Sequence, residues 1–262
     1  MSKLKKNNSY FASDFHLGAP NFQESLEREK KIVDWLTSIQ DQASDIYLVG
    51  DIFDFWFEYK KAIPKGFIRF QGKIAELTDS GVNVHFFLGN HDMWMFDYFE
   101  KELGVLIHRA PLLKKIGNHQ FYITHGDGLG PGDNYYKFLK KIFNNRFFQW
   151  CFARVHPNLG IRIANYCSKT SRKKSSLEEE KYLGDDKEWL LLYAKDLLTK
   201  KPIDYFVFGH RHLPIQKKLG GKSMYFNLGD WLYFNTFGVY DGDHFKLLTY
   251  PDNELFFNSS KN

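Results

Sequence analysis

Short apolar runs alternate with amphipathic segments along the first half of the chain. The apolar runs are residues 9–13, 46–49 and 82–88, and the amphipathic segments are residues 24–40 and 67–78. In the first amphipathic segment Ile32, Trp35, Leu36 and Ile39 recur at the helical period, and the second ends before Gly81, as helices often do. This alternation of strand and helix predicts right-handed crossovers and parallel strands.

The pattern changes in the second half of the chain. Residues 121–124 and 205–208 are again isolated apolar runs, whereas beyond residue 213 the runs are closely spaced, at residues 222–227, 237–240 and 244–248. Closely spaced runs separated by turn residues favour antiparallel or mixed pairing. We therefore predict an α/β fold in which two mixed β-sheets pack as a sandwich flanked by helices, a four-layer arrangement.

A long segment between these two regions has no strand pattern. Three helices are predicted there, at residues 134–152, 157–168 and 178–198, and the polar stretch 169–176 is interpreted as a mobile connector. The prediction is thus a core of residues 1–133 and 199–262 with an inserted helical lid of residues 134–198.

Charge sets part of this lid apart. Residues 134–177 contain ten Lys and Arg, nine aromatic residues and no acidic residue, although the whole chain carries only +5. Cations beside apolar surface suit a ligand with both phosphate and acyl parts, and they also suit an anionic membrane face. The alternative interpretation is a solvated basic face above an aromatic core of the lid.

Composition and cysteine usage indicate the compartment. No apolar segment follows the basic first eight residues, and no run of about 18 apolar residues exists, so neither a signal peptide nor a membrane span is expected. The two cysteines, Cys151 and Cys167, are interpreted as structural thiols in a reducing cytoplasm, although the sequence leaves a disulfide between them open. Attachment to a membrane surface is also left open.

Five short polar motifs follow the predicted strands. They share Asp, Asn and His side chains, the hard and borderline ligands that suit Mn²⁺, Fe or Zn²⁺. Because they come at strand ends, folding is expected to bring them to one edge of the sheets. The motifs are Asp14-Phe15-His16, Gly50-Asp51, Gly89-Asn90-His91-Asp92, Thr124-His125-Gly126-Asp127 and Gly209-His210-Arg211-His212.

Two cations held side by side would explain this set of ligands. Asp51 is the natural bridging ligand, because a carboxylate can donate one oxygen to each cation. The two ligand sets are then Asp14, His16 and His212 for one metal, and Asn90, His125 and His210 for the other. A pair of cations clamps a phosphoryl group and activates a shared water. Residues two apart on a strand share a face, which is the expected arrangement for both Asp14 with His16 and His210 with His212.

His91 has a separate expected role. Paired with the Asp92 carboxylate, its imidazole could protonate the leaving group or stabilise the phosphate oxygens. The alternative for Asp92 is that it caps a helix at residues 93–101.

These motifs resemble those of the calcineurin-like metallophosphoesterase superfamily over nearly the whole chain. Longer segments are similar to the UDP-2,3-diacylglucosamine diphosphatases, which carry a helical lid between the fourth and fifth motifs. One departure is His91, because the best-known proteobacterial members have Arg after the Gly-Asn pair. The matching segments are Gly50-Asp51-Ile52-Phe53-Asp54-Phe55-Trp56, Asp14-Phe15-His16-Leu17-Gly18, and His125-Gly126-Asp127 followed by Asp133.

This resemblance implies an activity, a cofactor and a location. The expected reaction is metal-dependent hydrolysis of the pyrophosphate bond of UDP-2,3-diacylglucosamine to 2,3-diacylglucosamine 1-phosphate and UMP in lipid A biosynthesis. Two divalent cations are expected, with Mn²⁺ favoured, in a cytoplasmic protein peripheral on the inner face of the cytoplasmic membrane. The residues implied to contact substrate are Asn90, His91, Asp133, Ser168 and Arg172.

Two other functions compete with this interpretation. A nuclease or another phosphodiesterase could use the interleaved basic and aromatic residues to hold single-stranded nucleic acid, although the compact apolar lid argues against nucleic acid as a partner. A non-catalytic scaffold would have lost metal ligands, yet all seven candidates are present.

Overall fold

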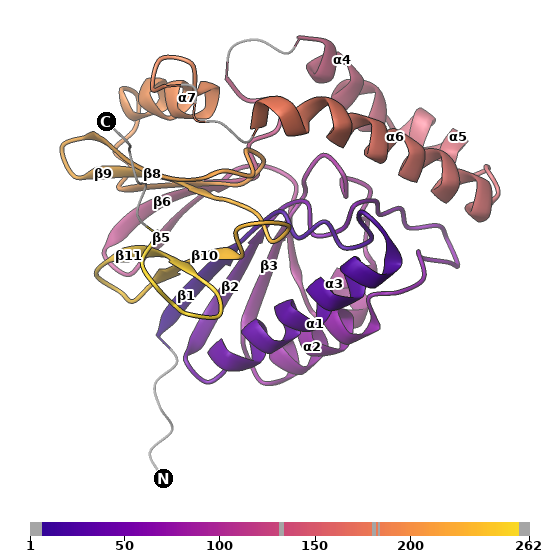
Figure 1. Cartoon of the computed structure of the whole chain (residues 1–262), viewed down its shortest axis with the longest axis horizontal. Helices are drawn as coiled ribbons and strands as arrows, with labels where there is room; N and C mark the ends of the chain where they lie inside the picture. The colour runs from indigo at the N-terminus through magenta and orange to yellow at the C-terminus, as the bar shows by residue number, and fades with distance from the viewer. Residues whose placement is uncertain (1–6, 131–133, 180–181, 183, 257–262) are drawn as a thin grey trace.

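The computed structural model describes residues 7–130, 134–179, 182 and 184–256, with only the backbone for residues 134–135 and 171–179. Two sheets form its centre (Figure 1). The first has the strand order β11-β10-β1-β2-β3-β4, in which β1 to β4 run parallel and β10 and β11 pair antiparallel. Its strands are β1 (Asn8–Ala12), β2 (Ala43–Val49), β3 (Asn83–Phe87), β4 (Leu106–His108), β10 (Thr236–Tyr240) and β11 (Phe245–Thr249).

The second sheet has the order β5-β6-β7-β9-β8. Its three middle strands are parallel, and its two outer strands pair antiparallel to them. The strands are β5 (Leu112–Ile116), β6 (His119–Thr124), β7 (Tyr205–Phe208), β8 (Pro214–Gly220) and β9 (Ser223–Leu228). The prediction of two mixed sheets is therefore confirmed.

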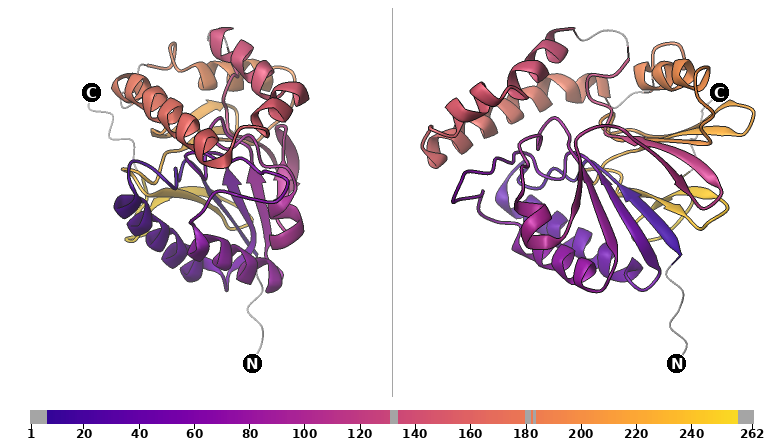
Figure 2. Two further views of the ribbon diagram at one scale, coloured as in Figure 1. Left: turned by 90° about the vertical axis from the view of Figure 1, so that its right-hand side faces the viewer. Right: turned by 180° about the vertical axis from the view of Figure 1, so that it is seen from behind.

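Helices cover both outer faces of this sandwich (Figures 1 and 2). Helices α1 (Phe22–Ile39), α2 (Ile68–Asp79) and α3 (Tyr98–Leu103) pack on the first sheet, and α7 (Trp189–Leu198) packs on the second. The four-layer arrangement follows from this, because each sheet buries one face against its partner sheet and the other against helices.

The period-two alternation of the strands explains the layers. In β1, Phe11 points into the cluster between the sheets, whereas Tyr10 and Ala12 join the cluster under the helices. In β2, Tyr47 lies between the sheets while Leu48 faces the helices. Strands with two buried faces have continuous apolar sequences, which is why these runs were recognisable.

The remaining helices lie across the strand ends, at the top right of Figure 1. They are α4 (Asn134–Phe143), α5 (Arg146–Phe152) and α6 (Pro157–Glu179), which we call the lid helices. Both cysteines lie on the lid helices and are free, exposed thiols. Among the described helices, no stretch is long and apolar enough to cross a bilayer.

The lid differs from its predicted form in two places. The expected connector at residues 169–176 is part of α6, because Lys, Arg and Ser are tolerated in a helix and the stretch has no Gly or Pro. The helix expected at residues 178–198 begins only at Trp189, since Gly184 adopts a positive φ of 100° that ends helical geometry. Helix α7 falls within the predicted insertion of residues 134–198, but it packs on the second sheet as a layer of the core.

Candidate metal centre

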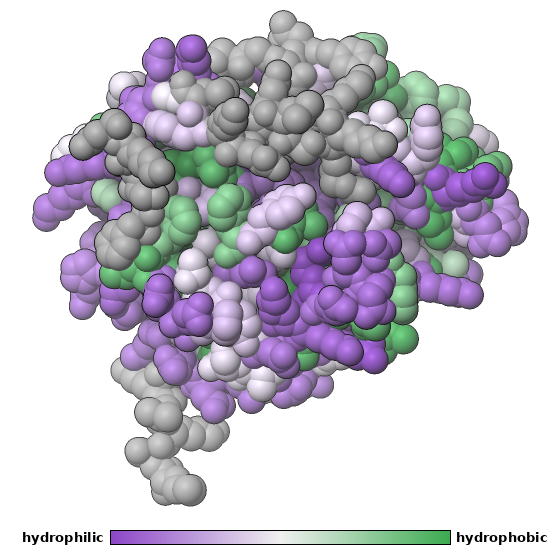
Figure 3. All heavy atoms as spheres, in the orientation of Figure 1, coloured by the Kyte–Doolittle hydropathy of each residue, from purple (hydrophilic) through white to green (hydrophobic). Residues whose placement is uncertain are grey.

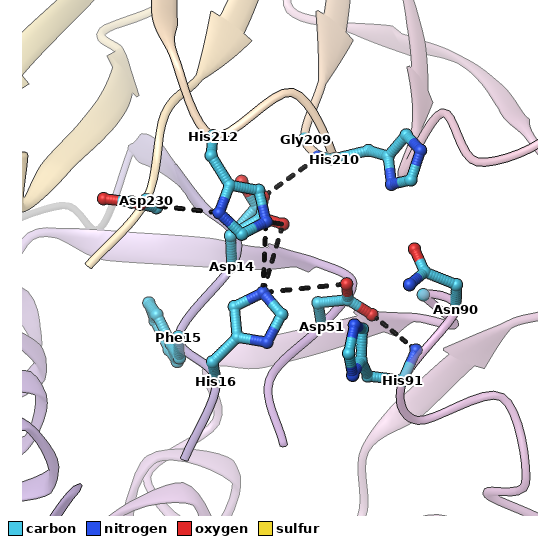
Figure 4. Close-up of polar contacts among 12 residues, drawn as sticks. Asp14, Phe15, His16, Asp51, Asn90, His91, Gly209, His210, His212 and Asp230 are labelled. Atoms are coloured by element: carbon cyan, nitrogen blue, oxygen red, sulfur yellow. Dashed lines mark hydrogen bonds and ion pairs between the residues drawn. The ribbon is translucent and has the colours of Figure 1, made fainter. Parts of the chain in front are cut away.

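The five motifs converge at one edge of the sandwich, and residues of the first, second, third and fifth motifs are labelled in Figure 4. Three of them follow β1, β2 and β3 of the first sheet, and two follow β6 and β7 of the second. Backbone hydrogen bonds join neighbouring motifs, from Asp14 N to Gly50 O at 3.1 Å, His16 N to Asp51 O at 3.0 Å and Gly209 N to His125 O at 3.0 Å. Backbone hydrogen bonds therefore hold the ligand loops together without a contribution from metal.

The ligands themselves occupy an unusual backbone conformation. Asp14, His16, Asp51, His210 and His212 all have φ between 43° and 67°. Left-handed backbone costs an L-residue about 1–2 kcal/mol, and such residues concentrate where the surroundings fix them for function. Asp14 with His16, and His210 with His212, were expected to share a face of a strand. Both pairs lie instead in loops beyond their strands, so the strand pleat does not explain why they come together.

Glycines allow the close approach of these loops. A Cβ at Gly209 would lie 2.8 Å from Asp14 Oδ2, and a Cβ at Gly89 would collide with the Asp51 carboxylate. The Gly before His210 and the Gly before Asn90 therefore each make room for a carboxylate from another motif.

One group of candidate ligands comprises Asp14, His16, Asp51 and His212. The two imidazole Nε2 atoms of His16 and His212 lie 3.2 Å apart. They face Asp14 Oδ1 at 3.8 and 3.3 Å, and His16 Nε2 lies 3.8 Å from Asp51 Oδ2. Asp14 Oδ1 is buried and receives no hydrogen bond from the described residues. A buried carboxylate oxygen without a donor, facing two imidazole nitrogens, fits a divalent cation.

The second group comprises Asp51, His125 and His210, so Asp51 belongs to both groups. His125 Nε2 lies 3.4 Å from Asp51 Oδ2 and 3.3 Å from the Asn90 side-chain oxygen. All seven residues expected as ligands are therefore brought together, with Asp51 between the two groups as a bridging ligand requires.

The pKa shifts of Asp51, His125 and His210 fit a charged carboxylate surrounded by imidazoles. Burial works to raise the pKa of Asp51, but the His125 and His91 imidazoles hold it far below its ordinary value. Burial lowers and the Asp51 charge raises the pKa of His125, which ends at about 10, whereas burial and the His125 charge lower that of His210 to about 4. The Asp51 carboxylate therefore stabilises positive charge on the neighbouring His125 imidazole, and it would stabilise a bound cation in the same way.

A second layer of acceptors orients the imidazoles. His125 Nδ1 donates to Val49 O at 2.9 Å, His16 Nδ1 lies 3.6 Å from Asp54 Oδ1, and His212 Nδ1 lies 3.5 Å from Asp230 Oδ2. Partners of this kind fix which nitrogen faces the metal. Asp230 was missed from sequence, although Gly229-Asp230 after β9 repeats the Gly-Asp pattern of Gly50-Asp51.

Arg28 supports the first motif from α1. Its buried guanidinium donates to Phe15 O at 2.7 Å, to His16 O at 2.8 Å and to Ala19 O. One side chain thereby holds three carbonyl groups of the loop that carries Asp14 and His16. Nothing in the local sequence of α1 indicates this long-range contact.

His91 lies against the first ligand group, with its ring 4.9 Å from that of His16. Its Nδ1 donates to Asp54 O at 3.0 Å, because a carbonyl oxygen can only accept. Burial, the largest effect, lowers the pKa of His91 to about 4. The neutral tautomer leaves Nε2 for a substrate.

Asp92 does not pair with His91, so that part of the prediction is wrong. Its Oδ2 accepts from Ile52 N at 2.7 Å and its Oδ1 accepts from Gly89 N at 2.8 Å. Asp92 therefore ties the second motif to the third, and burial raises its pKa to about 7. The alternative of a cap is also wrong, because α3 begins at Tyr98 after Asp97.

The substrate residues expected in the lid have different outcomes. Ser168 of α6 donates to Asp54 O at 2.9 Å, and its Oγ lies 3.2 Å from His91 Nδ1, so α6 reaches the site. Asp133 lies outside the described residues, and the side chain of Arg172 does as well. Their roles stay predictions.

An apolar cleft of about 550 Å³ opens beside the first ligand group. It lies between the start of α6 and the core, and Asp54 borders it together with Leu17 of the first motif. Its size falls within the range of small-molecule sites. The apolar lining comes from Phe22, Leu26, Phe55, Ile63, Pro64, Phe67 and Ile161.

Comparison with known proteins agrees with this geometry. The sequence model described as calcineurin-like phosphoesterase matches residues 9–214. A UDP-2,3-diacylglucosamine hydrolase of Porphyromonas gingivalis is 36% identical, covering 94% of this chain and 98% of that protein. A protein of the same name from Proteus mirabilis is 26% identical over 92% of this chain and 98% of its own length. The resemblance seen in the motifs is confirmed, and the chain belongs to the calcineurin-like phosphoesterase family.

Proposed function

We propose that this protein hydrolyses the pyrophosphate bond of UDP-2,3-diacylglucosamine, releasing UMP and 2,3-diacylglucosamine 1-phosphate in lipid A synthesis. The observation that carries this proposal is the apolar cleft beside a cluster of seven metal-ligand side chains. A phosphate-reactive centre beside an apolar cleft suits a substrate that joins a pyrophosphate to acyl chains. The similarity to relatives named UDP-2,3-diacylglucosamine hydrolase supports the same substrate.

The chain's own residues would bind two divalent cations and arrange the phosphate. Asp14, His16 and His212 would hold one cation, and Asn90, His125 and His210 the other, with Asp51 shared. Bound cations would supply an activated water and neutralise charge on the phosphate. The water oxygen would bond to one phosphorus of the pyrophosphate as the bond from that phosphorus to the bridging oxygen breaks. The bridging oxygen leaves on the other phosphate, and the water protons pass to the two product phosphates or to solvent. We propose Mn²⁺ as the cation, which the family resemblance favours among the metals that suit carboxylate, amide and imidazole ligands.

His91 would act on the phosphate without binding metal. The Asp54 carbonyl accepts the Nδ1 proton, so Nε2 of the neutral ring is an acceptor and would take the proton that a phosphate oxygen carries. Ser168 of α6 donates to the same carbonyl, which supports a role for this lid residue beside His91.

The acyl chains would occupy the cleft under α6. Burial of an acyl chain contributes about 0.8 kcal/mol per methylene, so partial burial of two chains would dominate substrate affinity. The sugar and its phosphate would then lie toward Asp54, where the cleft borders the ligand cluster.

We also propose that the protein attaches to the inner face of the cytoplasmic membrane, from which such a substrate would come. Apolar and charged side chains alternate over the lid helices on the right of Figure 3. Phe147 is 64% exposed on α5, and Phe22 is 78% exposed at the rim of the cleft. Cations near such residues favour an anionic membrane by about 1 kcal/mol each.

One comparison of substrates tests the proposal. The purified protein with Mn²⁺ is assayed on UDP-2,3-diacylglucosamine, on a small chromogenic phosphodiester and on single-stranded DNA. We expect UMP release from the lipid substrate with far higher kcat/KM than turnover of the other two. Preferred cleavage of DNA or of the small diester would overturn the lipid assignment in favour of a nuclease or a general phosphodiesterase. Absence of turnover on all three, with metal bound, would favour a scaffold.

A further inference from the structure

An arginine in the middle of the fifth motif is turned away from the metal ligands. Arg211 lies between His210 and His212 in sequence, and only 1% of it is exposed. Its Nε lies 3.1 Å from Glu188 Oε2 and its Nη2 lies 3.2 Å from Glu188 Oε1. The pair is bidentate and buried, because the Glu188 side chain is only 2% exposed.

Glu188 is the N-cap residue of α7, directly before its first helical residue. The next two residues, Trp189 and Leu190, lie against the fourth motif and the residues that follow it. A Cβ at Gly126 would lie 2.9 Å from Leu190 Cδ1, and a Cβ at Gly130 would lie 2.8 Å from Trp189 O. The loops that carry His125, His210 and His212 therefore all rest on the start of α7. The Arg211 guanidinium also lies 5.6 Å from the centre of the Trp189 ring.

Arg211 and Glu188 form two hydrogen bonds of defined geometry, which stability alone does not explain. Apolar side chains of similar volume often replace a buried ion pair without loss of stability, so a retained pair calls for another reason. Two parallel hydrogen bonds fix both the position and the orientation of the guanidinium plane. Arg211 is flanked by His210 and His212, whose left-handed φ values of 67° and 57° persist only where neighbouring groups enforce them.

We propose that the Arg211–Glu188 pair positions His210 and His212 for metal binding, with Arg211 as a positioning residue. His210 N donates to Asp14 Oδ2 at 3.0 Å, and His212 Nε2 lies 3.3 Å from Asp14 Oδ1. A small rotation of the 209–212 loop would therefore break the hydrogen bond from the His210 backbone to Asp14 and move the His212 imidazole away from Asp14. This inference rests on the metal-dependent hydrolase proposed above.

A double-mutant cycle separates positioning from stability. The variants are Arg211→Met, Glu188→Gln and the double variant, each measured for thermal unfolding without metal and for Mn²⁺ affinity by calorimetry without substrate. Each single variant leaves one buried charge without its partner, so we expect a lower unfolding temperature and weaker metal binding, by about 10-fold to 100-fold. The double variant removes both charges, so its unfolding temperature should return toward that of the unaltered protein. Its Mn²⁺ affinity should stay at least about 10-fold weaker.

Recovery of metal affinity together with stability in the double variant would overturn the proposal and make the pair purely structural. If the single variants fail to fold, the double variant alone decides between the two outcomes. Arg211→Lys keeps the charge without the paired hydrogen bonds, so its metal affinity should fall between those of the unaltered protein and Arg211→Met.

A matched control lies nearby. Lys217 pairs with Asp185 at 3.1 Å, with side chains 33% and 51% exposed. Lys217→Met removes an exposed ion pair and should leave both measurements unchanged. The unaltered protein is tested in the same series for Mn²⁺ binding and for UMP release. Failure of the unaltered protein to bind Mn²⁺ would contradict the proposed function, whereas binding that survives in the double variant would contradict only the role of Arg211.

Discussion

At the scale of single residues, the shared carboxylate of Asp51 is the feature on which the site depends. It belongs to both ligand groups, and its Oδ1 also accepts a hydrogen bond from His91 N at 2.9 Å. Its Oδ2 faces the Nε2 atoms of both His16 and His125, at 3.8 and 3.4 Å, so one oxygen lies between the two ligand groups.

Replacement of this carboxylate should abolish turnover. Asp51→Ala removes the ligand shared by both cations, so we expect no measurable UMP release and a loss of bound metal. Metal content by mass spectrometry and the lipid substrate assay check this. Asp41→Ala alters an exposed aspartate and serves as the control. Full metal content in Asp51→Ala would contradict a bridging role.

Replacement of His91 should affect the chemistry alone. His91→Ala is expected to lower kcat by about 10²–10⁴, the usual range for a positioned acid or base, with two cations still bound. The control is His244→Ala, at an exposed position. Loss of metal from His91→Ala would instead make His91 a ligand or a support for one.

The ligands could be predicted from sequence because each motif follows a strand, and because Asp51, Asn90 and His210 come directly after glycine. Their supports could not be. Arg28, Glu188 and Asp230 contact the motifs only because distant elements pack together, and a local pattern carries no record of that packing. The role expected for Asp92 failed for the same reason, since backbone N–H groups of the second motif compete for its carboxylate.

At the scale of elements, the buried strands and the first two helices were predictable, whereas the marginal elements were not. Strand β4 has only three residues, and β5 alternates half-buried with exposed positions, so its sequence is not distinguished from that of a loop. The polar stretch at residues 169–176 predicts a break, yet it is helical in α6, because polarity alone does not end a helix.

The cleft under α6 should decide acyl recognition. Ile161→Trp would fill part of the space, so kcat/KM for the diacylated substrate should fall about tenfold or more if even two methylenes are displaced. The small phosphodiester should be unaffected, since it needs only the metal centre. Ile163→Trp, at a 47% exposed position on the same helix, is the matched control. Equal losses on both substrates would assign the cleft a structural role.

At the scale of the whole molecule, apolar groups at the surface should govern membrane attachment. Phe147→Ser combined with Phe22→Ser removes two well-exposed rings from the lid and the cleft rim. We expect weaker sedimentation with vesicles containing anionic phospholipid, and weaker binding at high salt for every variant. Leu255→Ser, at a 48% exposed site near the C-terminal strand, should behave like the unaltered protein. Binding to neutral vesicles that equals binding to anionic ones would exclude an electrostatic contribution.

The division of the ligands between the two sheets has a mechanical consequence. Each ligand group combines residues that follow strands of the first sheet with residues that follow strands of the second. Bound cations would act as cross-links that join the two sheets at one edge, much as a disulfide joins two chain segments. Chelation should then loosen this edge before the rest of the molecule. Amide hydrogen exchange near residues 50, 90, 125 and 210 should accelerate after metal removal, while the buried centres of β1 and β2 stay protected.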